Sequence, residues 1–234
     1  MKECIAIVVP AYNPAPKWET ILHIRFEELC QSMPDIEFSL YLVNDGSTKN
    51  ISEQQIDYLR SSLSSFHYKS ISTNHGKGYA LREVVQMVTE PYVVYTDIDM
   101  PFKLTSMQEL ISQLPNFDLV FGIKEADYYQ QLPIQRRFVS KSLQFFIKIL
   151  FPSLPTSDTQ CGLKGMNEKA KEIFLSTKIN RYLFDLEFIL FCSKNHFKIK
   201  PIHVSLREGI VFGNMSSKIL WNEFKNLFKI LKDK

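Results

Sequence analysis

The chain has 234 residues, of which 45% are hydrophobic and 23% charged, a balance that predicts one soluble globular domain with a sizeable core. Its net charge of +3 is too small to indicate nucleic acid as a partner, and no block of Lys and Arg suggests a duplex-binding face. The four cysteines lie far apart without a Cys-x-x-Cys pair, which argues against a zinc site or a disulfide framework and favours reduced thiols in the cytosol.

The first half of the chain alternates between strand-like and helix-like segments. Strand-like segments cover 5–12, 38–45, 67–73 and 92–98, and helix-like segments cover 17–33, 52–65 and 77–88. Such alternation with short connections predicts a parallel sheet. The apolar run from Ile5 to Val9 lacks polar alternation, as strands covered by helices on both faces do. We therefore expect an α/β fold with a doubly wound, mostly parallel sheet.

The second half is less regular. It contains a strand over 118–124, a long helix-like segment that ends at Phe151, a helix from Glu168, an alternating strand over 198–208 and a last helix from about Ser216. No apolar run approaches ~20 residues, and the N-terminus lacks a cleavage-like site, so we expect neither a membrane-spanning segment nor secretion. These features predict one cytoplasmic domain.

Polar residues follow each of the first four predicted strands, namely Asn13, Asp45, Asn74 and Asp97. Ligands of open α/β sheets bind outside the carboxyl ends of the strands. The pattern therefore predicts a binding site at one edge of the sheet.

Asp97 and Asp99 stand one residue apart at the end of the fourth predicted strand. Side chains at i and i+2 of an extended chain share a face, so both carboxylates are expected to point at one cation. A hard divalent ion such as Mg²⁺ or Mn²⁺ takes oxygen ligands and bridges to substrate phosphates. The alternative is a polar strand end before a turn at Met100 and Pro101.

Two further segments suggest contacts with a nucleotide. Asp45 precedes Gly46, which allows a sharp turn, and its carboxylate is suited to accept hydrogen bonds from a base or ribose. The segment from Asn74 to Gly78 joins a strand to a helix, where backbone N–H groups and Lys77 can meet a phosphate, although no Walker A motif is present. Arg82 is placed to reach the same ligand. The alternatives are a structural turn for Asp45 and a solvated helix residue for Arg82.

The order of five segments resembles the serial motifs of family-2 glycosyltransferases with the glycosyltransferase-A fold. They are PAYNP at 10–14, NDGS at 44–47, NHGKGYALR at 74–82, TDID at 96–99 and DTQCGLKG at 158–165. Within that family the chain is most similar to polyprenyl-phosphate sugar transferases of the dolichyl-phosphate β-glucosyltransferase type, which carry a segment like YLFDLE at 182–187. The resemblance covers about residues 4 to 215.

The resemblance implies a role for each matching residue. Those that hold the nucleotide sugar are Pro10, Ala11, Tyr12, Asn13, Asp45, Lys77, Arg82 and Asp97. Asp97 and Asp99 bind the metal and diphosphate, and Asp99 does so most directly. Asp158 and Gln160 lie near the transferred sugar and acceptor, with Asp158, Gln160 and Asp99 as the catalytic set.

The resemblance implies that other positions bind the acceptor or support the site structurally. Arg136, Arg137 and Lys141 meet an acceptor phosphate, unless they form a solvated basic helix face. The chain departs from the family at Lys124, where relatives often have Arg, so that a point charge replaces a bidentate fork. Asp185 and Glu187 are expected to be supporting carboxylates rather than catalysts.

The implied reaction is metal-dependent and inverting, from a UDP-sugar such as UDP-glucose to a polyprenyl phosphate. Such a phosphate is already ionised near pH 7, because its second pKa is about 6. If the acceptor is instead a glycan hydroxyl, a base is needed, and Asp158 is the first candidate. A nucleotide-sugar-binding protein without turnover is a third hypothesis. The nucleotide-binding half is expected over about 1–124 and the acceptor half over about 125–215.

The segment 216–234 predicts a C-terminal amphipathic helix. Its apolar stripe consists of Ile219, Leu220, Phe224, Leu227, Phe228 and Leu231, with several lysines elsewhere around the helix. Such a helix can lie in a membrane interface, or it can pack on the domain's own core. A peripheral position on the cytoplasmic face of a membrane, or a membrane-protein partner, is thus a further expectation.

Overall fold

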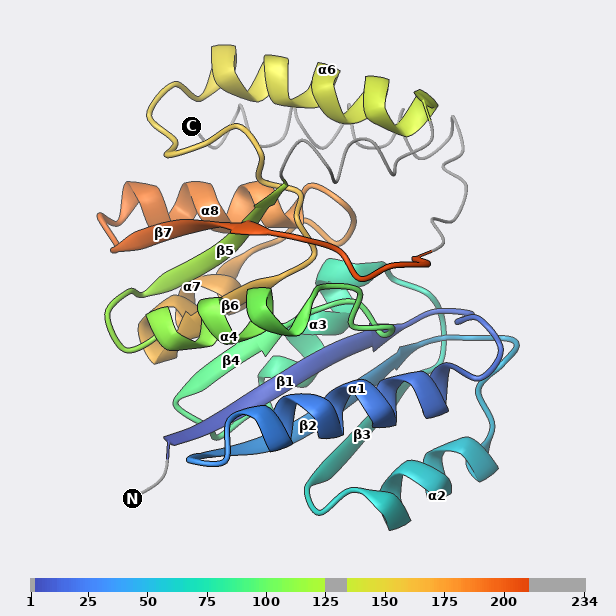
Figure 1. Cartoon of the computed structure of the whole chain (residues 1–234). Coiled ribbons are helices and arrows are strands. Elements are labelled where there is room, and N and C mark those ends of the chain that lie inside the picture. The colour runs from blue at the N-terminus through green and yellow to red at the C-terminus, as the bar shows by residue number, and fades with distance from the viewer. Residues whose placement is uncertain (1–2, 125–133, 211–234) are drawn as a thin grey trace.

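Strands and helices alternate through the first half of the computed structural model, which describes residues 3–124 and 134–210 (Figure 1). In chain order the elements are β1 (Glu3–Ala11), α1 (Trp18–Ser32), β2 (Ile36–Asp45), α2 (Glu53–Ser62), β3 (Phe66–Ile71), α3 (Lys77–Val85), β4 (Tyr92–Tyr95) and α4 (Leu104–Gln113). The four strands and three helices expected here are confirmed. Helix α4 was not expected.

The second half adds three strands and three helices among the described residues. They are β5 (Leu119–Lys124), α6 (Ile134–Leu150), β6 (Lys164–Asn167), α7 (Glu168–Ser176), α8 (Phe184–Lys194) and β7 (Ile199–Val204). The predicted strand over 118–124 and the helix from Glu168 are confirmed. Strand β6 was not expected, because it begins inside the 158–165 motif and its residues include no apolar run.

The strands of the described residues form one seven-stranded sheet in the order β3-β2-β1-β4-β6-β5-β7. All neighbours pair in parallel except β6, which is antiparallel to both β4 and β5. Lys164, the first residue of β6, is opposite Tyr95 on one side and Phe121 on the other. The segment that enters β6 therefore lies at the same sheet edge as the segments that leave β4 and β5.

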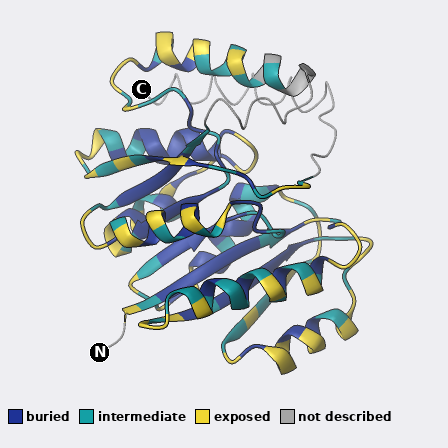
Figure 2. Cartoon of the chain, in the orientation of Figure 1, coloured by how far each residue is buried: buried dark blue, intermediate teal, exposed yellow. Residues whose placement is uncertain are grey.

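Helices cover both faces of the sheet, which confirms the doubly wound arrangement. One apolar cluster joins α1, α2 and α4 to one face, with residues such as Leu22, Ile56 and Leu110 fully buried. The other joins α3, α7 and α8 to the opposite face, with Leu81 and Phe174 fully buried. Strands β1, β2 and β4 are nearly continuous buried surfaces between these layers (Figure 2). Burial on both faces explains their unbroken apolar runs.

The predicted C-terminal helix over 216–234 lies outside the described residues. Among the helices that the structure does describe, none is long and apolar enough to cross a membrane. All four cysteines fall within the described ranges, and none of them forms a disulfide.

Candidate active site

Asp97 and Asp99 lie in a tight turn rather than on one face of a strand. Strand β4 ends at Tyr95, and the N–H of Met100 donates to the carbonyl of Asp97 at 2.8 Å. Met100 adopts a positive φ of 40°, and the guanidinium of Arg25 on α1 donates to the carbonyl of Asp99. The expectation that an extended chain pairs the carboxylates is therefore wrong; a turn held from α1 brings them together.

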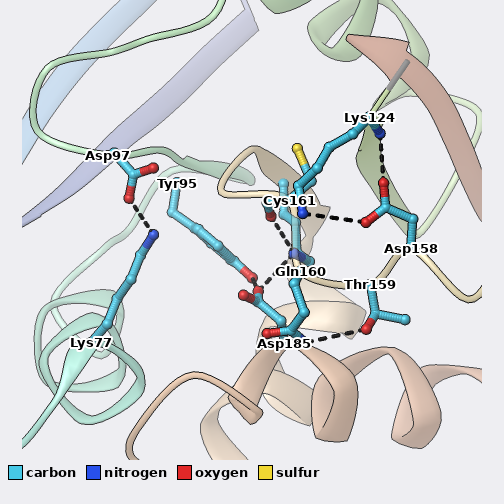
Figure 3. A network of polar contacts seen from close by, with 10 residues as sticks. Lys77, Tyr95, Asp97, Lys124, Asp158, Thr159, Gln160, Cys161 and Asp185 are labelled. Atoms are coloured by element: carbon cyan, nitrogen blue, oxygen red, sulfur yellow. Dashed lines mark hydrogen bonds and ion pairs between the residues drawn. The ribbon is translucent and has the colours of Figure 1, made fainter. Parts of the chain in front are cut away.

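The Asp97 carboxylate meets two other motifs. Its Oδ1 atom is 2.5 Å from the ammonium of Lys77, the first residue of α3 (Figure 3). Its Oδ2 atom lies against Gly162, where an added Cβ would be only 2.5 Å away. Burial opposes the charge of Lys77, but the carboxylates of Asp97 and Asp185 together outweigh it, and the pKa of the ammonium is raised. Three of the predicted motifs thus converge on one side chain.

The negative charge of Asp99 is balanced less well by neighbouring cations than that of Asp97. Burial, and then repulsion from Asp97, raise the pKa of its carboxyl above the usual value. A bound divalent cation would relieve both effects, and two carboxylates supply the hard oxygen ligands that Mg²⁺ or Mn²⁺ prefers. The donor set therefore fits such a metal. No cluster of three or more His, Cys, Asp or Glu side chains suited to a metal occurs in the described parts of the chain.

Asp45 organises the loop before α3. Its carboxylate accepts hydrogen bonds from the side chain of Asn74 and from the backbone N–H groups of His75 and Gly76, at 2.8 to 2.9 Å. The N–H groups of Gly78 and Tyr79, in the first turn of α3, both donate to the carbonyl of Asn180. Three N–H groups of the segment 74–78 therefore already have partners within the protein, and a phosphate contact at the remaining ones stays a prediction.

The segment 10–14 stabilises the turn after β2 through hydrogen bonds. Pro10 and the buried Ala11 end β1, and the Asn13 side chain accepts hydrogen bonds from the N–H groups of Thr48 and Lys49 at 2.9 and 3.1 Å. Asn13 itself has a positive φ of 46°. Tyr12 between them is 53% exposed, so its ring faces solvent at the sheet edge where the four polar strand ends meet.

Arg82 makes contacts other than those expected. It is 8% exposed, and its guanidinium donates to the Thr177 hydroxyl, the Ile179 carbonyl and the Asn180 side chain. It is neither a solvated helix residue nor, in these contacts, a nucleotide ligand. Instead it holds the segment before α8 against α3, and so supports the loop that carries Lys77.

Asp158 is paired with Lys124 on the opposite side of the site (Figure 3). Its carboxylate accepts from the Lys124 backbone N–H at 2.7 Å and lies 3.4 Å from the Lys124 ammonium. Gln160 is half-buried and donates to the Thr159 hydroxyl at 3.1 Å. Sequence reasoning noted Lys124 only as a departure from the family and missed it as the partner of Asp158.

A buried polar network lies beneath these groups. Lys164 is fully buried, with its ammonium 2.7 Å from Asp185 and 2.6 Å from the Cys161 carbonyl, and the Tyr95 hydroxyl donates to Asp185 at 2.6 Å. Glu187 accepts from the backbone N–H groups of Lys178 and Ile179. Both carboxylates are thus supporting, as expected. Lys164 was missed, although its place in the 158–165 motif is the signal that pointed to it.

The predicted acceptor residues lie on α6. Arg136, Arg137 and Lys141 fall within this helix; Arg137 is half-buried and Lys141 is exposed. The helix rests on the face covered by α8 through the buried side chain of Ile147. Phe145, Phe146 and Ile149 on the same helix are 63%, 49% and 59% exposed.

Comparison with solved structures places this architecture in a known class. The chain is similar to Staphylococcus aureus TarS 1–349 in complex with UDP-GlcNAc, with a TM-score of 0.52 and 17% identity over 99% of this chain and 66% of that chain. It is also similar to the mannosyltransferase PcManGT from Pyrobaculum calidifontis in complex with GDP-Man and Mn²⁺, with a TM-score of 0.55 and 12% identity over 87% and 55% of the two chains. The fold is that of the glycosyltransferase-A enzymes.

The family assignment follows from the sequence comparison. The model of glycosyl transferase family 2 matches residues 6–174, and the chain belongs to that family. It is 26% identical over 217 residues to a dolichyl-phosphate β-glucosyltransferase of Dictyostelium discoideum and 21% identical over 224 residues to one of Saccharomyces cerevisiae. The alignments cover 87% of this chain and 66% and 67% of those proteins, so the chain spans about two thirds of their length.

Proposed function

We propose that the protein transfers a sugar, with inversion, from a nucleotide sugar to a polyprenyl phosphate in a reaction that depends on Mg²⁺ or Mn²⁺. The observation that carries the proposal is the contact of Asp97 with Gly162, which joins the carboxylate turn to the 158–165 motif. This contact brings the residues proposed for the diphosphate next to those proposed for the sugar and acceptor.

The donor is inferred to be a UDP-sugar, with UDP-glucose as the first choice. Support comes from the relatives named dolichyl-phosphate β-glucosyltransferase and from the fold shared with a protein solved with UDP-GlcNAc. The base and ribose would lie near Tyr12 and the turns that Asn13 and Asp45 hold together. In this role Asp45 shapes the pocket through its three hydrogen bonds to residues 74–76.

Asp99, with Asp97, would hold the metal. When bound, the metal would neutralise the negative charge that develops on the leaving diphosphate. Lys77 supplies a second positive charge at the same place, on a flexible stem that begins at the first residue of α3. The turn that carries both carboxylates is fixed by Arg25, so their positions are set before a substrate arrives.

The contacts of Asp158 favour a phosphate acceptor over a hydroxyl. Both of its oxygens are engaged by Lys124, through the backbone N–H and the ammonium. To take a proton from an acceptor hydroxyl, the carboxylate would first have to give up one of these contacts. A polyprenyl phosphate needs no such base, since it is already ionised near neutral pH. The Lys124 ammonium would help to attract it.

The surface of α6 is consistent with an acceptor that carries a lipid. The exposed side chains Phe145, Phe146 and Ile149 lie on the same helix as the basic residues Arg137 and Lys141. An amphipathic helix with aromatic and basic side chains can rest in a membrane interface. We propose that α6, together with the segment 216–234, docks the domain on an anionic membrane surface.

The test is a transfer assay with purified protein, Mn²⁺ or Mg²⁺, and a panel of nucleotide sugars. Each donor is paired with a polyprenyl phosphate, with a soluble glycan acceptor, or with no acceptor. We expect transfer to the polyprenyl phosphate from UDP-glucose, and none after addition of EDTA. Asp99→Ala should fold and show no transfer, while Arg137→Ala with Lys141→Ala should impair transfer far more than donor binding. Full transfer to the soluble glycan without activity on the lipid phosphate would defeat the proposal.

A further inference from the structure

Lys77 and Asp97 form an ion pair inside the proposed metal site. Their contact is 2.5 Å long, and the two side chains are 29% and 47% exposed. Lys77 is the first residue of α3, so its backbone position is fixed by the helix while its four-carbon stem keeps rotational freedom. The ammonium is therefore a movable cation next to a carboxylate that the proposed reaction needs for a metal.

The two oxygens of Asp97 are both in contact with other groups. Oδ1 carries the Lys77 ammonium, and Oδ2 packs against the backbone of Gly162. A metal ion that binds Asp97 through Oδ1 has to share this oxygen with the ammonium or displace it. Sharing would bring two positive charges close together, which is unfavourable in a partly buried site.

The donor diphosphate offers the displaced ammonium a new partner. In the loop before α3, the N–H groups of His75 and Gly76 bond Asp45, and that of Gly78 bonds Asn180. The Lys77 side chain can thus change partner without breaking any of these backbone hydrogen bonds. Burial disfavours an isolated charge at this position, so an anionic phosphate is a favourable new partner for the ammonium when it leaves Asp97.

We propose that Lys77 is an internal counter-ion that competes with the metal for Asp97 and moves to the diphosphate when the nucleotide binds. The metal then binds weakly to the free protein and tightly to the nucleotide complex. This gain in metal affinity is larger than the gain that direct bonds between metal and phosphate produce. By linkage the effect is reciprocal. This inference rests on the proposed function, because it uses the same metal and diphosphate.

The experiment measures Mn²⁺ binding to the full chain by electron paramagnetic resonance, without nucleotide, for wild type and Lys77→Met. Calorimetry in EDTA measures the affinities of the same proteins for UDP and for uridine without metal. Lys69→Met is a matched control: Lys69 forms a 2.8 Å ion pair with Glu83 of α3, and the two side chains are 30% and 28% exposed. Lys77→Arg keeps the charge, and Lys77→Gln is a second neutral variant should Lys77→Met fail to fold.

We expect the neutral variants to bind Mn²⁺ alone about fivefold to tenfold more tightly than wild type, because the competing cation is gone. Their affinity for UDP in EDTA should fall about tenfold, whereas uridine binding should not change. Lys69→Met and Lys77→Arg should match wild type for Mn²⁺ alone. Unchanged or weaker Mn²⁺ binding by a folded neutral variant would overturn the inference while leaving the proposed function intact. A wild-type protein that binds neither Mn²⁺ nor UDP would defeat both.

Discussion

The carboxylate of Asp97 lies directly against the backbone of Gly162, at a distance that leaves no room for a Cβ atom. Gly162 belongs to the segment that enters β6, and Asp97 follows β4, the neighbouring strand. A residue without a side chain is therefore required at 162 so that the carboxylate can keep its position beside Lys77.

This contact predicts the effect of Gly162→Ala. The new methyl group would overlap Asp97 Oδ2 at 2.5 Å, so the carboxylate must rotate or the turn must shift. We expect Mn²⁺-dependent UDP affinity to fall by roughly tenfold or more, since a ligand displaced by about 1 Å loses much of its effect. Calorimetry with and without Mn²⁺ measures this, and a melting curve checks that the variant is folded. If folded Gly162→Ala binds UDP with Mn²⁺ as tightly as wild type does, the Asp97 carboxylate does not need its place against residue 162 for binding.

Asp99 gives a prediction about pH. Its carboxyl pKa is raised by burial and by Asp97, so the folded state binds this proton more tightly than the unfolded state does. The wild-type protein therefore loses stability as the pH rises through the raised pKa. Asp99→Asn, which carries no charge, should raise Tm in EDTA by roughly 1–3 °C at pH 7. The difference should disappear below the unperturbed pKa of 3.8.

The control for this pH experiment is Asp57→Asn. Asp57 forms an exposed ion pair with Arg60, a contact that contributes little to stability, so its Tm should change by less than about 1 °C. If Asp99→Asn melts at or below the wild-type temperature at pH 7, burial and the charge of Asp97 do not destabilise the Asp99 carboxylate in the free protein.

Asp45→Ala tests the support of the loop before α3. Removing the carboxylate leaves the buried N–H of Gly76 without its acceptor and frees Asn74 and His75. We expect unfolding free energy to fall by about 2–3 kcal/mol in urea titrations, the cost of an unsatisfied buried donor plus lost hydrogen bonds. Asp57→Ala is the surface control. A loss below about 0.5 kcal/mol for Asp45→Ala would mean that the loop finds other partners.

The buried Lys164–Asp185 pair predicts strong coupling. Lys164→Met would leave Asp185 as a buried charge without its cation and should cost about 3–5 kcal/mol of unfolding free energy. Adding Asp185→Asn should restore part of that loss, because the remaining polar group is neutral and still meets the Tyr95 hydroxyl. A double-mutant cycle by urea denaturation gives the coupling. Strict additivity of the two changes would contradict an energetic link between β6 and α8.

The sequence was informative where the signal is local. Unbroken apolar runs predicted the buried strands, and the five ordered segments predicted which loops meet at the carboxyl edge of the sheet. Asp185 and Glu187 make contacts within the protein, as a supporting role requires. These inferences depend on side-chain period and segment order, both of which can be read directly from the chain.

Partners distant in the sequence could not be predicted in this way. Arg82 bonds residues 95 to 98 positions further along the chain, and Asp158 is 34 positions from Lys124. Arg82 and Asp158 were both predicted to contact a substrate. No local feature of the sequence distinguishes a charged residue that supports the fold from one that binds a ligand. Strand β6 was missed because its sequence, unlike that of the equally short β4, contains no run of apolar residues.

The position of β6 also bears on how the domain assembles. Strands β4 and β5 do not pair with each other; both pair with β6, which the ribosome delivers some 40 residues after β5 is complete. A nascent chain that ends near residue 124 thus has β4 with an open edge and β5 with neither of its neighbours. We therefore expect the nucleotide-binding and acceptor halves, which meet near residue 124, to differ in binding role but to fold as one unit. The carboxylate site should gain its final shape only when β6 inserts between β4 and β5.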